Sequence, residues 1–139
     1  MTGGVIRIRS FLYGRFFRKL TMQKSPYWLD APEDHDYPAA ESYLSLLMAE
    51  QDAQALVAKL QAAPMTAFKA KDILRASCLP HLGEENRHVA KNLQKMQTGK
   101  RLSPVLLARG QKLVIADGYH RCCAVYLLDE DAEIPCKIV

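Results

Sequence analysis

No hydrophobic run in this sequence approaches the ~18–20 residues that a membrane-spanning helix needs. Glycine and proline contribute only seven residues each of 139, far below the contents of a collagen-like chain, which this excludes. The composition is 49% hydrophobic and 24% charged, which is typical of a globular protein rather than a disordered one. A chain of this length suits one domain with a helical appendage.

The four cysteines lack the spacing of a zinc site or of a disulfide framework. Cys122 and Cys123 are adjacent, Cys78 and Cys136 stand apart, and no CxxC pair occurs. Adjacent cysteines are poorly placed to close a disulfide-bonded loop. We therefore expect reduced thiols that serve as small hydrophobic side chains, and a cytoplasmic localisation.

Acidic residues are absent from residues 1–24, the basic arm, which contains six basic residues. Residues 25–58 show the opposite, with seven acidic residues and no Lys or Arg. The arm lacks a secretory h-region and a cleavage site. It could bind nucleic acid or an anionic membrane surface, or pack against the acidic block. The simplest interpretation is a disordered arm, or a start at Met22 that makes residues 1–21 an upstream extension.

Residues 25–64 are predicted to form an acidic linker followed by a helical extension. Asp36 can cap a helix from Ala39 to about Glu50, and Asp52 can cap a second helix that Pro64 ends. We expect this extension to pack without taking part in chemistry. The broad apolar face of its first helix comprises Tyr43, Leu44, Leu46, Leu47 and Met48.

Residues 65–139 are predicted to form a mixed α and β domain. A helix from Glu84 to Thr98 should end at Gly99, and the short turn after Ala108 predicts a hairpin. If the strands around the last helix are parallel, their connection is a right-handed crossover. We expect His88 to be an exposed polar residue without a role. The remaining predicted elements are strands 65–69, 103–108, 112–116 and 134–139, and helices 70–76 and 121–128.

The sequence Asp117-Gly118-Tyr119-His120-Arg121 lies where an apolar strand meets a helix. A helix N-terminus has unpaired N–H groups and partial positive charge, which together favour anions. Arg121 can clamp a phosphate through two hydrogen bonds, and His120 can donate a hydrogen bond or move a proton. Asp117 could bind Mg²⁺ or orient a hydroxyl group. The alternative is purely structural, with Asp117 capping the helix and Gly118 making the turn.

The last 75 residues, 65–139, resemble the ParB/sulfiredoxin-like superfamily. In that superfamily a helix ends at Gly before a Pro-hydrophobic strand, a second strand enters a Gly-x-His/Arg-Arg signature, and an x-Pro-hydrophobic strand follows. The matching positions here are Gly99 to Pro104, Val105–Leu107, Gly118-Tyr119-His120-Arg121, Ala124 and Ile134-Pro135.

The resemblance implies nucleotide handling. Sulfiredoxins bind ATP and use the Cys of a Gly-Gly-Cys-His-Arg loop; Tyr119 stands in that place, so sulfinic-acid repair is not expected. Partition ParB proteins carry Gly-Glu-Arg-Arg, bind CTP and need a following helix-turn-helix domain, for which no residues remain after the last predicted strand. The ParB-like free serine kinases carry an Asp-Gly-His-His-Arg type of loop, the version most similar to residues 117–121, which implies phosphoryl transfer.

We therefore expect an α+β fold of the ParB/sulfiredoxin-like type that binds a nucleoside triphosphate with Mg²⁺. If the protein is an enzyme, it would be a phosphotransferase or NTPase. Arg121 and the backbone of Gly118, Tyr119 and His120 would hold phosphates, with His120 stabilising developing charge and Asp117 acting as Mg²⁺ ligand or base. The alternative is a non-catalytic module that binds protein or nucleic acid; a homodimer is compatible with either function. Candidate contacts to nucleic acid are Lys91, Lys95, Lys100 and Arg101.

Overall fold

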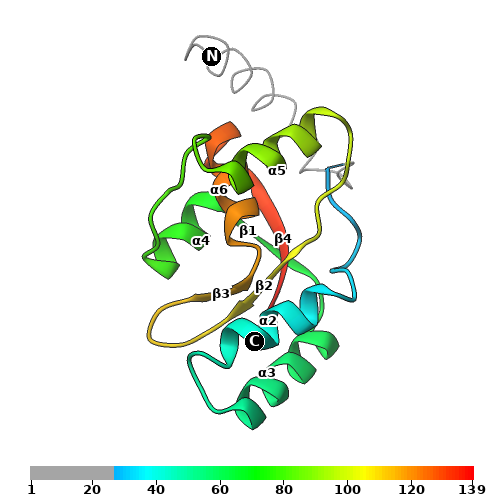
Figure 1. Cartoon of the computed structure of the whole chain (residues 1–139), viewed down its shortest axis with the longest axis vertical. Coiled ribbons are helices and arrows are strands. Elements are labelled where there is room, and N and C mark those ends of the chain that lie inside the picture. The colour runs from blue at the N-terminus through cyan, green and yellow to red at the C-terminus, as the bar shows by residue number, and fades with distance from the viewer. Residues whose placement is uncertain (1–26) are drawn as a thin grey trace.

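The computed structural model describes residues 27–139, in which helices and strands form a mixed α and β structure (Figure 1). The basic arm and the alternative start at Met22 lie outside these residues. The α+β class expected from the sequence is confirmed for the described part. Its elements are α2 (Asp36–Leu44), α3 (Glu50–Ala62), β1 (Thr66–Lys69), α4 (Ala70–Ser77), α5 (Arg87–Gln97), β2 (Val105–Ala108), β3 (Val114–Asp117), α6 (Tyr119–Leu128) and β4 (Glu133–Ile138).

The four strands form one sheet in the order β1-β4-β2-β3. β1 is antiparallel to β4, and β2 and β3 form the predicted antiparallel hairpin. β4 pairs with β2 in parallel, with Val105 opposite Cys136. β3 and β4, the strands before and after α6, are therefore neither adjacent nor parallel. The right-handed crossover that parallel strands would form around α6 is absent between them. The parallel pair is β2 and β4, which are joined through β3 and α6.

The sheet is covered on both faces. Val105 and Leu107 of β2 belong to a core shared with α4, α5 and α6, whereas Leu106 between them packs with α2 and α3. Successive side chains of a strand point to opposite faces, so a strand buried on both faces is apolar throughout. β2, with the sequence VLLA, is fully buried for this reason. In Figure 1, α2 and α3 lie together at the bottom, with α4, α5 and α6 above them.

The segment before α2 is irregular but packed. Trp28 is 3% exposed and forms a β-bridge with Leu102, so residues 27–35 are attached to the domain rather than free. α2 begins at Asp36, earlier than predicted, and this residue lies inside the helix rather than capping it. Its buried carboxylate accepts hydrogen bonds from the Glu33 N–H and from the Ser103 hydroxyl. These bonds connect α2 to the segment that enters β2.

Three further predicted helix boundaries are wrong. α2 ends at Leu44 rather than near Glu50; the Ser45 hydroxyl donates to the Ser42 carbonyl, an interaction that competes with helical bonding. α3 is capped by Ala49, and the predicted cap, Asp52, lies in its first turn. α5 likewise begins at Arg87 and not at Glu84.

The start of α5 is set by Asn86. Its side-chain oxygen accepts hydrogen bonds from the N–H groups of His88 and Val89, at 2.9 and 3.2 Å. This is the N-cap arrangement that satisfies otherwise unpaired donors. At the other end, Gly99 has φ +80°, as the prediction of a glycine after the helix requires.

Candidate functional site

The five residues singled out from the sequence lie together where β3 enters α6. Asp117 is the last residue of β3, Gly118 is the N-cap of α6, and the helix begins at Tyr119. Gly118 has φ +110°, and a Cβ there would lie 2.4 Å from Val105 Cγ1. Only glycine fits this position without strain, because both the backbone conformation and the space exclude a side chain.

Asp117 and Arg121 form an ion pair across the first turn of α6. Arg121 Nη2 lies 2.8 Å from Asp117 Oδ2, and both side chains are less than a fifth exposed. The same nitrogen donates to the Pro104 carbonyl at 3.5 Å. Burial raises the pKa of Asp117, and the positive charge of Arg121 opposes that rise without cancelling it. One guanidinium nitrogen, Nη2, is thus bonded to an internal carboxylate, whereas Nε is buried without a hydrogen-bond partner among the described residues.

Tyr119 holds the loop that follows α4. Its hydroxyl donates a hydrogen bond of 2.7 Å to the Pro80 carbonyl, and burial raises its pKa. The ring lies 5.3 Å from that of His120. The phenol therefore joins the start of α6 to the loop after α4.

Helix α5 brings further polar groups to the same place. The rings of His88 and His120 have centroids 4.8 Å apart. Burial lowers the pKa of His120, and the nearby His88 and Arg121 lower it further. His88 is exposed, as expected, but its ring is in direct contact with His120 of the predicted site.

A pocket of about 250 Å³ lies between α5 and the N-terminus of α6. Lys91 and Lys95, one helical turn apart on α5, line it, whereas Lys100 and Arg101 do not. Among the described residues, the one carboxylate in its lining is Asp117, which is already paired with Arg121. The pocket therefore combines an excess of positive charge with a helix N-terminus, which favours an anion. The full lining is His88, Lys91, Asn92, Lys95, Asp117, Gly118, Tyr119, His120 and Arg121.

The residues of this site do not form a metal centre on their own. Within residues 27–139 there is no group of three or more His, Cys, Asp or Glu that could hold a metal ion. Asp36 is near enough for its charge to raise the pKa of Asp117, but its carboxylate is bonded to Ser103 and to the Glu33 N–H. Mg²⁺ usually keeps several waters and binds through one or two carboxylates plus substrate phosphates. Asp117 alone could supply such a carboxylate.

The expectation that the cysteines serve as small hydrophobic side chains is confirmed for three of them and is wrong for Cys78. All four are free, and Cys122, Cys123 and Cys136 are buried, whereas Cys78 is exposed. Burial raises the pKa of Cys122 far above its usual value and that of Cys136 to about 12. The buried thiols therefore stay protonated and pack as small apolar groups.

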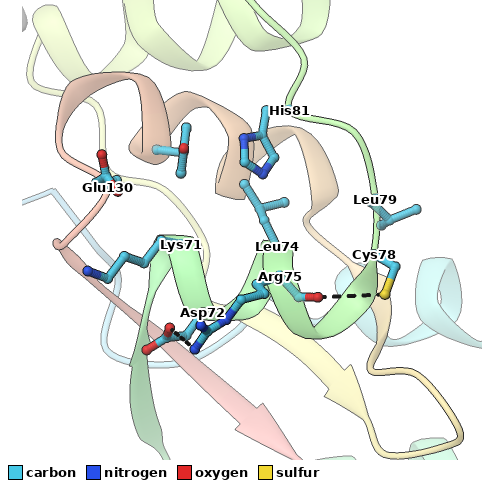
Figure 2. A pocket seen from close by; sticks show the side chains of 9 residues that line it. Lys71, Asp72, Leu74, Arg75, Cys78, Leu79, His81 and Glu130 are labelled. Carbon is cyan, nitrogen blue, oxygen red and sulfur yellow. Dashed lines mark hydrogen bonds and ion pairs between the residues drawn. The ribbon is translucent and has the colours of Figure 1, made fainter.

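A second pocket, of about 670 Å³, lies beside α4 and the end of α6 (Figure 2). Its two cations have carboxylate partners: Lys71 is 2.6 Å from Asp131, and Arg75 is 3.0 Å from Asp72. His81 stacks on Tyr126 with ring centroids 4.2 Å apart. Because its positive charges are neutralised by neighbours, this pocket attracts an anion less than the one at α6.

No protein-family model, curated protein or solved structure shows a significant match to this chain. None of the helices between residues 27 and 139 has the length and apolar character that crossing a bilayer requires.

Proposed function

We propose that the protein binds the phosphate groups of a nucleotide in the pocket between α5 and the N-terminus of α6. The observation that carries this proposal is the convergence of Lys91 and Lys95 on the first turn of α6. These residues and the loop 117–121 come from separate parts of the sequence. Phosphoryl transfer or NTP hydrolysis is the reaction that we assign to the site, in line with the resemblance to the ParB/sulfiredoxin-like superfamily.

Each group at the site has a role in this proposal. The first N–H groups of α6, from Tyr119 to Arg121, have no intrahelical acceptor and donate to phosphate oxygens. Lys91 and Lys95 balance the phosphate charge, and Mg²⁺ would be held mainly by the phosphates themselves with Asp117 as one ligand. Arg121 exchanges its bond to Asp117 for a phosphate oxygen.

The first test is a thermal-shift screen of the four common nucleoside triphosphates and pyrophosphate, with and without Mg²⁺. A ligand at 100 times its Kd contributes about 2.7 kcal/mol to apparent stability. Affinities of ligands that stabilise the protein are then measured by calorimetry. If no nucleotide or phosphate compound stabilises the wild-type protein, the proposal fails.

Variants locate the binding. The Lys91→Ala and Lys95→Ala double variant should bind about tenfold more weakly or worse, since it removes two cations from the pocket. Arg121→Ala should lose roughly 1.5–3 kcal/mol of binding free energy, and Arg121→Lys should recover only part of it. Arg109→Ala, an exposed cation in the β2–β3 loop, is the control and should bind as wild type does.

The alternative, a nucleic-acid-binding module, is supported by one feature of the sequence. Residues 86–116 contain seven Lys and Arg and no acidic residue, and α5 lies in this stretch. Binding of a duplex through such residues would weaken steeply with salt. A DNA-binding titration at two salt concentrations separates this function from binding of a free nucleotide.

A further inference from the structure

His88 and His120 occupy equivalent positions on their helices. His88 is the second residue of α5 and His120 the second residue of α6. Each ring therefore lies at the positive end of a helix macrodipole, where a protonated imidazole is disfavoured. Because the ring centroids are only 4.8 Å apart, a proton on one ring also opposes a proton on the other.

Most of the other charged groups around the two rings are positive, so they also oppose a proton on an imidazole. Lys91 and Lys95 of α5 line the pocket with both rings, as does Arg121 of α6. Among the described residues that line the pocket, Asp117 of β3 has the one carboxylate, and this carboxylate forms an ion pair with Arg121. The phenol of Tyr119 is bonded to the Pro80 carbonyl. Without a ligand, burial and the nearby His88 and Arg121 lower the pKa of His120.

A bound dianion reverses that balance. A phosphate at the N-terminus of α6 offsets the field of the helix and the charges of the lysines, and an opposite charge within ~4–6 Å favours a protonated imidazole. We propose that His88 and His120 form a proton-accepting pair, so that a phosphate dianion entering this pocket brings a proton from solvent onto the pair. This inference rests on the proposed function of the pocket and adds His88 to its binding groups.

Two consequences follow for the ligand. Affinity for a phosphate dianion should rise as the pH falls from 8 to 6, because the proton that binding requires becomes more available. The site should also prefer a terminal phosphate or sulfate dianion to a phosphodiester, whose single charge per phosphate gives less compensation for an imidazolium.

The test follows each imidazole by NMR. The chain has four histidines, and two of them, His35 beside Asp36 and His81 stacked on Tyr126, serve as internal controls. Imidazole ¹⁵N shifts of the full chain are titrated from pH 5 to 8 in chloride and in sulfate at matched ionic strength. Sulfate is the probe because it stays a dianion throughout this range.

In sulfate we expect the midpoint of the His88–His120 pair to move upward by about one pH unit, with His35 and His81 unchanged. In the His88→Gln variant, the gain in sulfate affinity between pH 8 and pH 6 should fall by at least half. His88 is exposed, so this variant should keep its fold, which its amide spectrum reports.

The outcomes separate this inference from the proposed function. If sulfate shifts the amides of Tyr119 to Arg121 but leaves the titration of the pair unchanged, the pocket binds anions and the proton-accepting pair is refuted. If sulfate, phosphate and pyrophosphate all leave those amides unchanged, the anion site itself is refuted. If sulfate shifts the titration midpoints of all four histidines equally, the shift is a nonspecific salt effect and the inference fails.

Discussion

The conformation of Gly118 allows a sharp test of how β3 enters α6. Alanine at this position must adopt φ +110°, and its Cβ would lie 2.4 Å from Val105 Cγ1 and 2.9 Å from Arg121 Nη2. Val105 is fully buried in the central strand β2, so it cannot move aside without disturbing the core. The substitution therefore combines backbone strain with a steric clash.

The magnitude follows from those two contributions. A left-handed conformation costs a non-glycine residue about 1–2 kcal/mol, and overpacking a core costs about 1–3 kcal/mol. We expect Gly118→Ala to lower the free energy of unfolding by about 2–5 kcal/mol. Gly99 is a matched control, because its φ is +80° but a Cβ at this position would have no neighbour within 4 Å. Gly99→Ala should therefore lose only the backbone contribution, about 1–2 kcal/mol.

Urea denaturation of the two variants and the wild type measures the difference. Gly118→Ala should unfold at clearly lower urea than Gly99→Ala, with a similar slope for both. Equal stability of the two variants would refute the steric part of the reasoning. A Gly118→Ala variant as stable as wild type would refute the described geometry of the turn.

Three further predictions concern groups around the site. Ser103→Ala removes the hydroxyl that donates to the buried carboxylate of Asp36, so it should lower the free energy of unfolding by about 1–3 kcal/mol in urea denaturation; no change would mean that this bond is dispensable. The pKa of His120 is lowered in the folded state, so the unfolded chain binds more protons near and below about pH 6.5, and the free energy of unfolding falls as the pH drops through this range. The His120→Gln variant should therefore lose less stability than the wild type between pH 7.5 and pH 5.5. An equal loss of stability in both proteins would contradict the lowered pKa of His120. A thiol reagent should modify Cys78 rapidly in the native protein and the other three cysteines only after unfolding, and rapid reaction of all four would show that the core is open.

The sequence predicted β2 well because this strand has a strong local signal. β2 is buried on both faces, and its apolar run SPVLLA indicates a strand whichever elements cover it. The end of α2 has no such signal. Leu46 and Leu47 suggested that the helix continues, yet they are 79% and 53% exposed in the turn after it. Hydrophobicity alone does not show that a turn intervenes.

The site was predicted in part for a similar reason. Residues 117–121 are contiguous, so one motif was enough to bring them together. His88 is 32 positions before His120 in the sequence, and only the packing of α5 against α6 makes them neighbours. One signal was available: recognising Asn86 as the cap would have placed His88, like His120, at the second position of a helix.

The sheet order has a consequence for how the chain assembles. Within residues 27–139, β1 pairs only with β4, and β4 is the last strand in the element order, yet it lies between β1 and β2. Until residues 133–138 are in place, β1 has no strand partner in this part of the chain, and the β2–β3 hairpin is separate from it. Closing the sheet therefore requires contacts between segments about 70 residues apart, such as Thr66 with Cys136, which favours late and cooperative completion of the fold.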